Sequence, residues 1–294
     1  MNVAQLTRPR RAQWLVPAIL LILTPVVQCQ QADETSGGTC AVFLQKGKNL
    51  ALVIDSAVTT FEGGVRLDRT KLACKVWLPN PGIVAATTGI LDTGHLSTSW
   101  NANTTGRSWL RELSLSPTES QVNVALRGWG EQLMRYLATH PIQHGNGEIA
   151  SLIVGFRAGG KSHIFRERIA KYDGKIVRDD EESVRWVLND GGASRLYTGS
   201  CRNFILIDGH RPIEITRSES NALDGLGDES HNPQITSADQ LGDLAIRFEE
   251  LFSQISKNHA TAPNSGDEIG PPFQLAVLPA DSSEWITSFR DPCK

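Results

Sequence analysis

A predicted strand, a tight turn and a second, wholly apolar strand follow one another directly between Thr39 and Ile54. Residues 46–49 form the turn, and the run 50–54 after it contains only Leu, Ala, Val and Ile. A strand that is apolar on both faces is typically covered on both faces, which excludes an open, one-sided sheet. The chain from Thr39 onward is therefore expected to begin with a buried antiparallel hairpin.

Further strands and two helices follow this hairpin. Two more strands at 70–77 and 83–86 complete an opening meander, and later strands are predicted at 151–156, 162–169, 184–188, 195–198 and 273–278. Capping sequences at 116–119 and 236–239 each precede apolar residues spaced by three or four, which is typical of an amphipathic helix. This order predicts an α+β fold of four layers (αββα), with two antiparallel sheets between helical layers.

Composition narrows the functions that need consideration. The chain has 294 residues and a formal net charge of −3, so it carries no basic footprint and no nucleic-acid partner is expected. Its five cysteines include no C-x₂₋₄-C pair, so neither a metal site nor a cofactor is predicted.

The N-terminal part differs from the rest. Arg8, Arg10 and Arg11 precede an uncharged run at 14–29, the order of a secretory signal peptide, with an uncleaved membrane anchor as the alternative. Residues 1–29 are thus predicted to direct export, 30–38 to be a propeptide or linker, and 39–294 to form the functional domain.

Three residues stand out as candidates for chemistry. Thr39 follows Gly38, Asp55 lies sixteen positions later at the end of the apolar strand, and Lys71 sixteen positions after that. In these features the chain resembles the proteasome β-subunit family of N-terminal-nucleophile hydrolases, whose mature chain begins at a threonine after glycine. The resemblance covers residues 38–92 closely and the rest in architecture. It implies cleavage between Gly38 and Thr39, and a threonine-type peptidase.

The residue types suit that chemistry. A threonine hydroxyl is a poor nucleophile, and a free N-terminal amine with a pKa of about 8 can act as its base. A lysine ammonium nearby disfavours protonation of the amine, and a carboxylate such as Asp55 holds the ammonium in place. The resemblance adds Ser200 and Asp267 as supporting residues, and the backbone at Thr88 and Gly89 as the oxyanion hole.

Several alternatives stay open at this stage. Cys40 is a rival nucleophile, since other enzymes of the N-terminal-nucleophile type use cysteine. The substrate is a peptide or a small amide, so a small-molecule amidase is one alternative function. A noncatalytic scaffold subunit is another. The resemblance also implies a homo-oligomeric ring.

The resemblance further implies a substrate pocket lined by Val58, Arg69 and Ala73. Because Arg69 and Lys71 share a strand face, Arg69 predicts a preference for acidic residues before the cut bond, unless it pairs with Asp68 or Glu62. In an exported protein, Cys40, Cys74, Cys201 and Cys293 are candidates for disulfides, with Cys40 and Cys74 expected on neighbouring strands.

Overall fold

The structure is a computed structural model, and it describes residues 34–36, 39–62, 65–72, 74–92, 101–141, 147–180, 183–188, 192–205, 213–259 and 269–288. The chain divides after Gln30, and all the described residues belong to the second part, Gln31–Lys294.

Two antiparallel sheets form the centre of this part. The described strands of the larger sheet are in the order β10-β9-β8-β7-β1-β4-β5, with β6 paired to β7 and β11 to β9. These strands are β1 (Glu34–Ser36), β4 (Ala57–Glu62), β5 (Val65–Leu72), β6 (Val76–Asn80), β7 (Ile83–Asp92), β8 (Gly147–Ala158), β9 (Lys161–Tyr172), β10 (Lys175–Arg178) and β11 (Arg185–Leu188). The smaller sheet has the order β12-β2-β3-β13-β14. Its strands are β2 (Cys40–Lys46), β3 (Asn49–Asp55), β12 (Ala193–Gly199), β13 (Phe273–Leu278) and β14 (Ile286–Ser288).

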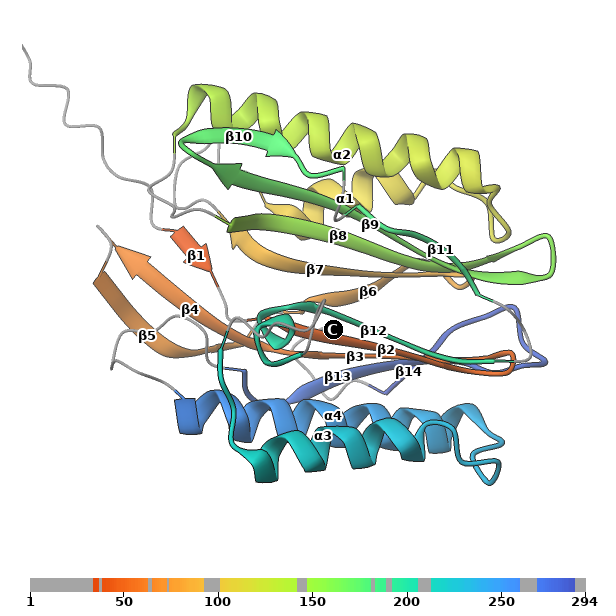
Figure 1. The fold of residues 1–294 in the computed structure, drawn as a ribbon. Helices are drawn as coiled ribbons and strands as arrows, with labels where there is room; N and C mark the ends of the chain where they lie inside the picture. The colour runs from red at the N-terminus through yellow and green to blue at the C-terminus, as the bar shows by residue number, and fades with distance from the viewer. Residues whose placement is uncertain are drawn as a thin grey trace, which may run out of the picture. The chain divides into compact units, whose positions relative to one another are not determined.

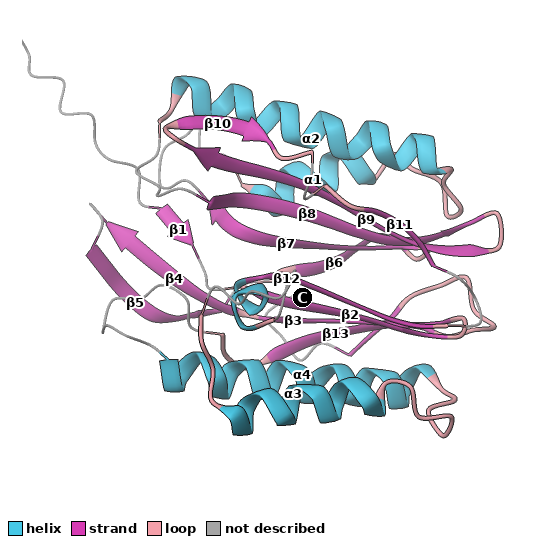
Figure 2. Ribbon diagram, in the orientation of Figure 1, coloured by secondary structure: helices cyan, strands magenta, loops and turns pink. Residues whose placement is uncertain are grey.

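Helices cover the outer face of each sheet, as Figure 1 shows. Helices α1 (Ala102–Leu110) and α2 (Glu119–Thr139) lie on the larger sheet, and α3 (Arg217–Glu229) and α4 (Ala238–His259) lie on the smaller one. A short 3₁₀ helix, η1 (Ser200–Phe204), follows β12. The four layers are helix, sheet, sheet and helix (Figure 2), so the predicted αββα fold is confirmed.

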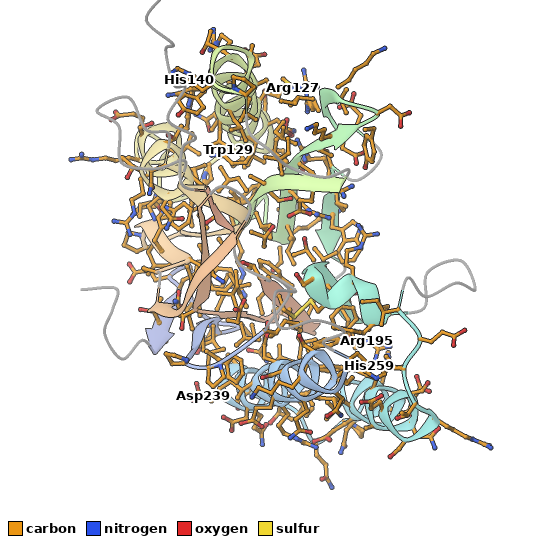
Figure 3. The ribbon with its side chains drawn as sticks, turned by 90° about the vertical axis from the view of Figure 1, so that its left-hand side faces the viewer. Arg127, Trp129, His140, Arg195, Asp239 and His259 are labelled. Atoms are coloured by element: carbon orange, nitrogen blue, oxygen red, sulfur yellow. A yellow bond between two sulfur atoms is a disulfide. The ribbon has the colours of Figure 1, made fainter. Side chains whose placement is uncertain are left out.

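Three apolar clusters hold the layers together. Trp129 of α2 is fully buried on the larger sheet, where Figure 3 shows it on the inner side of its helix. Phe43 and Ile153 belong to the cluster between the sheets, and Phe248 of α4 to the cluster under the smaller sheet. Strands β2 and β3 contribute residues to both of the last two clusters, which explains why 50–54 is apolar throughout.

The opening strands differ from the predicted meander in two ways. The hairpin β2–β3 belongs to the smaller sheet, whereas β4 to β7 belong to the larger one, so the chain changes sheet at Ser56. The single strand expected at 70–77 is two strands, β5 and β6, with an interruption before Val76.

The two predicted helices are present, with one change in capping. The capping box of α2 joins Thr118 to Gln121 rather than Ser116 to Glu119. At α4, Ser237 accepts from the Gln240 N–H, as the sequence at 236–239 indicates. Helix α1 was not predicted. Its sequence ANTTGRSWL has weak helix formers and a glycine, and its Gly106 packs closely against Trp77.

Candidate active site

The hairpin β2–β3 brings Thr39 and Asp55 together. Ala41 pairs with Ile54, so the strand ends that carry Thr39 and Asp55 lie side by side. The Cys40 N–H donates to Asp55 Oδ1 at 2.9 Å, which fixes the carboxylate next to the start of β2. Thr39 is 1% exposed and Asp55 is fully buried. Since this pairing needs only a tight turn, the spacing of the two residues in the sequence predicts it well.

A lysine completes the cluster, and it is Lys75. Its Nζ donates to Thr39 Oγ1 at 2.9 Å and lies 3.2 Å from each Asp55 carboxylate oxygen. The Lys75 side chain is fully buried. One ammonium therefore bridges a hydroxyl and its own counter-ion in a place closed to water.

The spacing in the sequence predicts Lys71 for this role, four residues earlier, and the structure places Lys75 there instead. The backbone of Lys71 pairs with Val58 in the β4–β5 hairpin, and its side chain is outside the described residues. The segment between Asp55 and the lysine of the site contains that hairpin, whose length can vary, so the number of residues from Thr39 does not locate the lysine. Thr87 does locate it, because the Thr87 N–H donates to the Lys75 carbonyl at 3.1 Å.

Burial and charge act against each other on this ion pair. Burial raises the pKa of Asp55 to about 6, although the Lys75 ammonium and the N–H groups of Cys40 and Gly270 lower it. Burial lowers the pKa of Lys75, and the Asp55 carboxylate opposes that shift. Above about pH 6 the carboxylate is ionised, and the pair holds its opposite charges without solvent.

A second carboxyl, Glu249 of α4, lies behind the pair. It is fully buried, and neither carboxyl oxygen has a hydrogen-bond partner within the described part of the chain. Burial, and then the charge of Asp55, raise the pKa of Glu249 well above 4.5, with Lys75 acting in the opposite direction. Glu249 is therefore the neutral acid when Asp55 and Lys75 are charged.

We expect Glu249→Gln to be more stable than the wild type at neutral pH. The folded state keeps a proton on Glu249 that the unfolded state releases above pH 4.5. Wild-type stability therefore falls by about 1.4 kcal/mol per pH unit above that value, until the folded-state pKa is reached. Glutamine is uncharged at every pH and has nearly the shape of the protonated acid, so the stability of the variant does not fall with pH at this position. Urea unfolding of both proteins from pH 4.5 to 8 measures the difference, and a difference independent of pH would contradict a neutral Glu249.

Ser200, a predicted supporting residue, contacts Thr39 through its main chain. Its backbone N–H donates to the Thr39 carbonyl at 2.7 Å. The turn before it requires glycine, because Gly199 has a φ of 74° and a Cβ there would lie 2.0 Å from the Thr39 carbonyl oxygen. Asp267 lies outside the described residues.

A disulfide braces the same corner of the site. Cys40 is bonded to Cys201, which lies 161 positions later in the sequence, and the two Cα atoms are 5.0 Å apart. This pairing differs from the expectation that Cys40 approaches Cys74. Cys74 is itself disulfide-bonded, but not to Cys40. Closing so long a loop stabilises the folded chain by about 3–5 kcal/mol. Since the Cys40 sulfur is held in this bond, the thiolate that a cysteine nucleophile needs is not available.

Thr88 and Gly89, the expected oxyanion hole, lie in β7 beside this cluster. The Thr88 hydroxyl donates to Glu148. Burial alone would raise the pKa of Glu148, but Arg166 and Arg168 outweigh it and the pKa is lowered. The buried Thr88 side chain is thus tied to an ionised carboxylate in β8.

Gly89 has a left-handed backbone conformation in a tightly packed place. Its φ is 80°, and a Cβ there would lie 2.2 Å from the Ile149 carbonyl oxygen, so only glycine fits. N–H groups two residues apart on a strand point to the same edge. The Thr87 N–H points toward Lys75. By this alternation the Gly89 N–H points to the same edge of β7, and the Thr88 N–H points to the opposite edge.

The expected pocket residues are not placed. The side chains of Val58 and Arg69 and the whole of Ala73 lie outside the described residues. The acidic preference depended on Arg69 sharing a strand face with the lysine of the site. Since that lysine is Lys75 and the strand is interrupted before it, the expectation has lost this basis.

Within the ranges given above, no three His, Cys, Asp or Glu side chains gather as metal ligands. No helix in that part of the chain combines the length and apolar character of a membrane span.

Comparisons with known proteins add a likeness in fold. No family model matches the sequence, and no curated protein matches it. Among solved structures, the chain is similar to the eukaryotic HslV from Trypanosoma brucei, at 16% identity and a TM-score of 0.37. The match covers 82% of this chain and 99% of that one. At this identity and TM-score the similarity carries no conclusion about what the chain does.

Proposed function

We propose that this protein is a threonine-type amide-bond hydrolase that activates itself by cutting between Gly38 and Thr39. The observation that carries the proposal is the contact of Lys75 Nζ with Thr39 Oγ1 at 2.9 Å and with Asp55 at 3.2 Å. A cation held against a hydroxyl at the predicted new N-terminus is the arrangement in which a neutral α-amine can act as base.

Self-cleavage comes first in this scheme. The Thr39 hydroxyl attacks the Gly38 carbonyl, and the acyl group moves from nitrogen to oxygen. In this shift the hydroxyl proton passes to the Thr39 nitrogen and the C–N bond breaks, which frees the Thr39 amine. Water then hydrolyses the ester, which releases the Gly38 carboxylate and restores the Thr39 hydroxyl. The strand β1 ends two residues before Gly38 and pairs with β4 and with β7, so the prosegment already lies along the strands that border the site.

Turnover uses the same hydroxyl. It attacks the substrate carbonyl while its proton moves to the α-amine, and the oxyanion takes a hydrogen bond from the Gly89 N–H. The amine returns the proton to the leaving nitrogen, and the acyl ester on Thr39 remains. Water, deprotonated by the amine, then releases the acid. The substrate is a peptide or a small amide.

Export remains part of the proposal. The Cys40–Cys201 disulfide supports it, since such bonds persist in oxidising compartments.

A covalent probe tests the proposed function directly. A peptide boronate forms a tetrahedral adduct with a hydroxyl nucleophile, so the mature protein should be inhibited by it. Mapping the bound boron by crystallography should find it on Thr39 Oγ. A boron atom bound to a different side chain would disprove the assignment.

A further inference from the structure

The main chain around Lys75 has an unusual support. Lys75 lies immediately before β6, outside the strand itself. Gln274 Oε1 accepts hydrogen bonds from the Lys75 N–H at 2.9 Å and from the Val76 N–H at 3.0 Å. A single side-chain oxygen thus takes the place that a neighbouring strand would otherwise fill.

Gln274 reaches this point from the opposite sheet. It lies on β13, where it pairs with Ile54, the residue before Asp55. Its neighbours Phe273 and Leu275 pack under α4, whereas Ala276 packs between the sheets. By alternation along the strand, Gln274 points between the sheets, and it is 2% exposed.

The other supports of this segment come from the larger sheet and its helix. The Thr87 N–H donates to the Lys75 carbonyl, and Asn103 Nδ2 of α1 donates to the Cys74 carbonyl. Those contacts tie the main chain before β6 to the larger sheet and to α1. Gln274 links Lys75 to the sheet that carries Thr39 and Asp55, the two groups that its ammonium must touch.

We propose that Gln274 is a positioning residue that holds the Lys75 ammonium against Thr39 and Asp55. The inference rests on the proposed function, and it adds a residue that does not touch the reacting atoms. An apolar side chain of the same length would fill the space but leave two buried N–H groups without an acceptor. The segment would then move toward another acceptor, and Nζ would leave its place beside the hydroxyl.

The test compares three variants of the mature protein. Gln274→Met keeps the length and removes the acceptor, so kcat should fall about 10- to 100-fold with KM within about twofold. Gln274→Glu keeps an acceptor oxygen in either protonation state and should restore most of kcat. Gln45→Met is the control, because Gln45 is a buried glutamine of the same sheet whose Nε2 bonds Gly47. It should lower the melting temperature and leave kcat unchanged.

A purely structural Gln274 would give a different result. In that case the folded fraction of Gln274→Met would keep kcat within about twofold of wild type, which would overturn the inference. If Gln274→Met does not fold, Gln274→Asn replaces it in the test, because its side chain is shorter by one methylene and its oxygen falls short of the two N–H groups. The same loss of kcat is expected for Gln274→Asn, and a kcat within about twofold of wild type would overturn the inference. Lys75→Ala separates the two claims. If Lys75→Ala keeps full turnover, the proposed function is wrong. If Lys75→Ala loses turnover and Gln274→Met does not, only the role of Gln274 is wrong.

Discussion

Lys75→Ala should abolish turnover, with a loss of about 100-fold or more in kcat, whereas Lys71→Ala should leave kcat near that of wild type. Lys75 Nζ contacts both the Thr39 hydroxyl and the Asp55 carboxylate. Removing it takes away the charge that keeps the α-amine unprotonated. Hydrolysis of a fluorogenic peptide, with both variants measured per folded protein, gives the comparison. Loss of activity in Lys71→Ala alone would show that the sixteen-residue spacing, and not the contact, identifies the catalytic lysine.

Folding needs a separate control in this experiment. Asp55 is fully buried, so losing its ammonium partner should cost about 3–5 kcal/mol of stability. The double variant Lys75→Met, Asp55→Asn removes both charges. It should be more stable than Lys75→Met alone, yet equally inactive. Recovery of turnover in the double variant would contradict the role assigned to Lys75.

Thr39→Ala should prevent both self-cleavage and turnover. Without the hydroxyl there is no attack on Gly38, so the chain should accumulate with the prosegment attached and show no turnover above background. Thr39→Ser keeps a hydroxyl at the same place and should still cut itself. Mass spectrometry and peptide hydrolysis on the purified variants check both points. Normal cleavage in Thr39→Ala would assign the cut to another residue or to a separate protease.

The parts of the fold that depend on local patterns could be predicted from the sequence. The hairpin β2–β3, the apolar faces of α2 and α4 and the four-layer arrangement follow from periodicity, capping residues and turn glycines. Helices α1 and α3 were missed, although each has a capping residue, Asn101 and Thr216. The weak helix formers of α1 include Gly106, which lies close against Trp77.

Like the fold, the site has a part that the sequence predicts and a part that only the tertiary structure reveals. Thr39 and Asp55 are joined by one tight hairpin, so their spacing in the sequence is also their spacing in space. Lys75 reaches them across the β4–β5 hairpin, where the count of residues carries no geometric information. Glu249 and Gln274 approach from α4 and β13, about two hundred residues away in the chain, and only tertiary packing reveals them. One signal for Lys75 was present, since it directly precedes the β6–β7 hairpin and lies opposite Thr87, whose N–H donates to its carbonyl.

The central claim is that Thr39 becomes the N-terminus of the working protein. The most direct measurement is the intact mass and N-terminal sequence of the purified, active protein. The account predicts a chain that begins Thr39-Cys40-Ala41, and a Thr39→Ala protein that keeps Gly38 attached. An active protein that begins at Gln30, with Thr39 still inside the chain, would contradict the account.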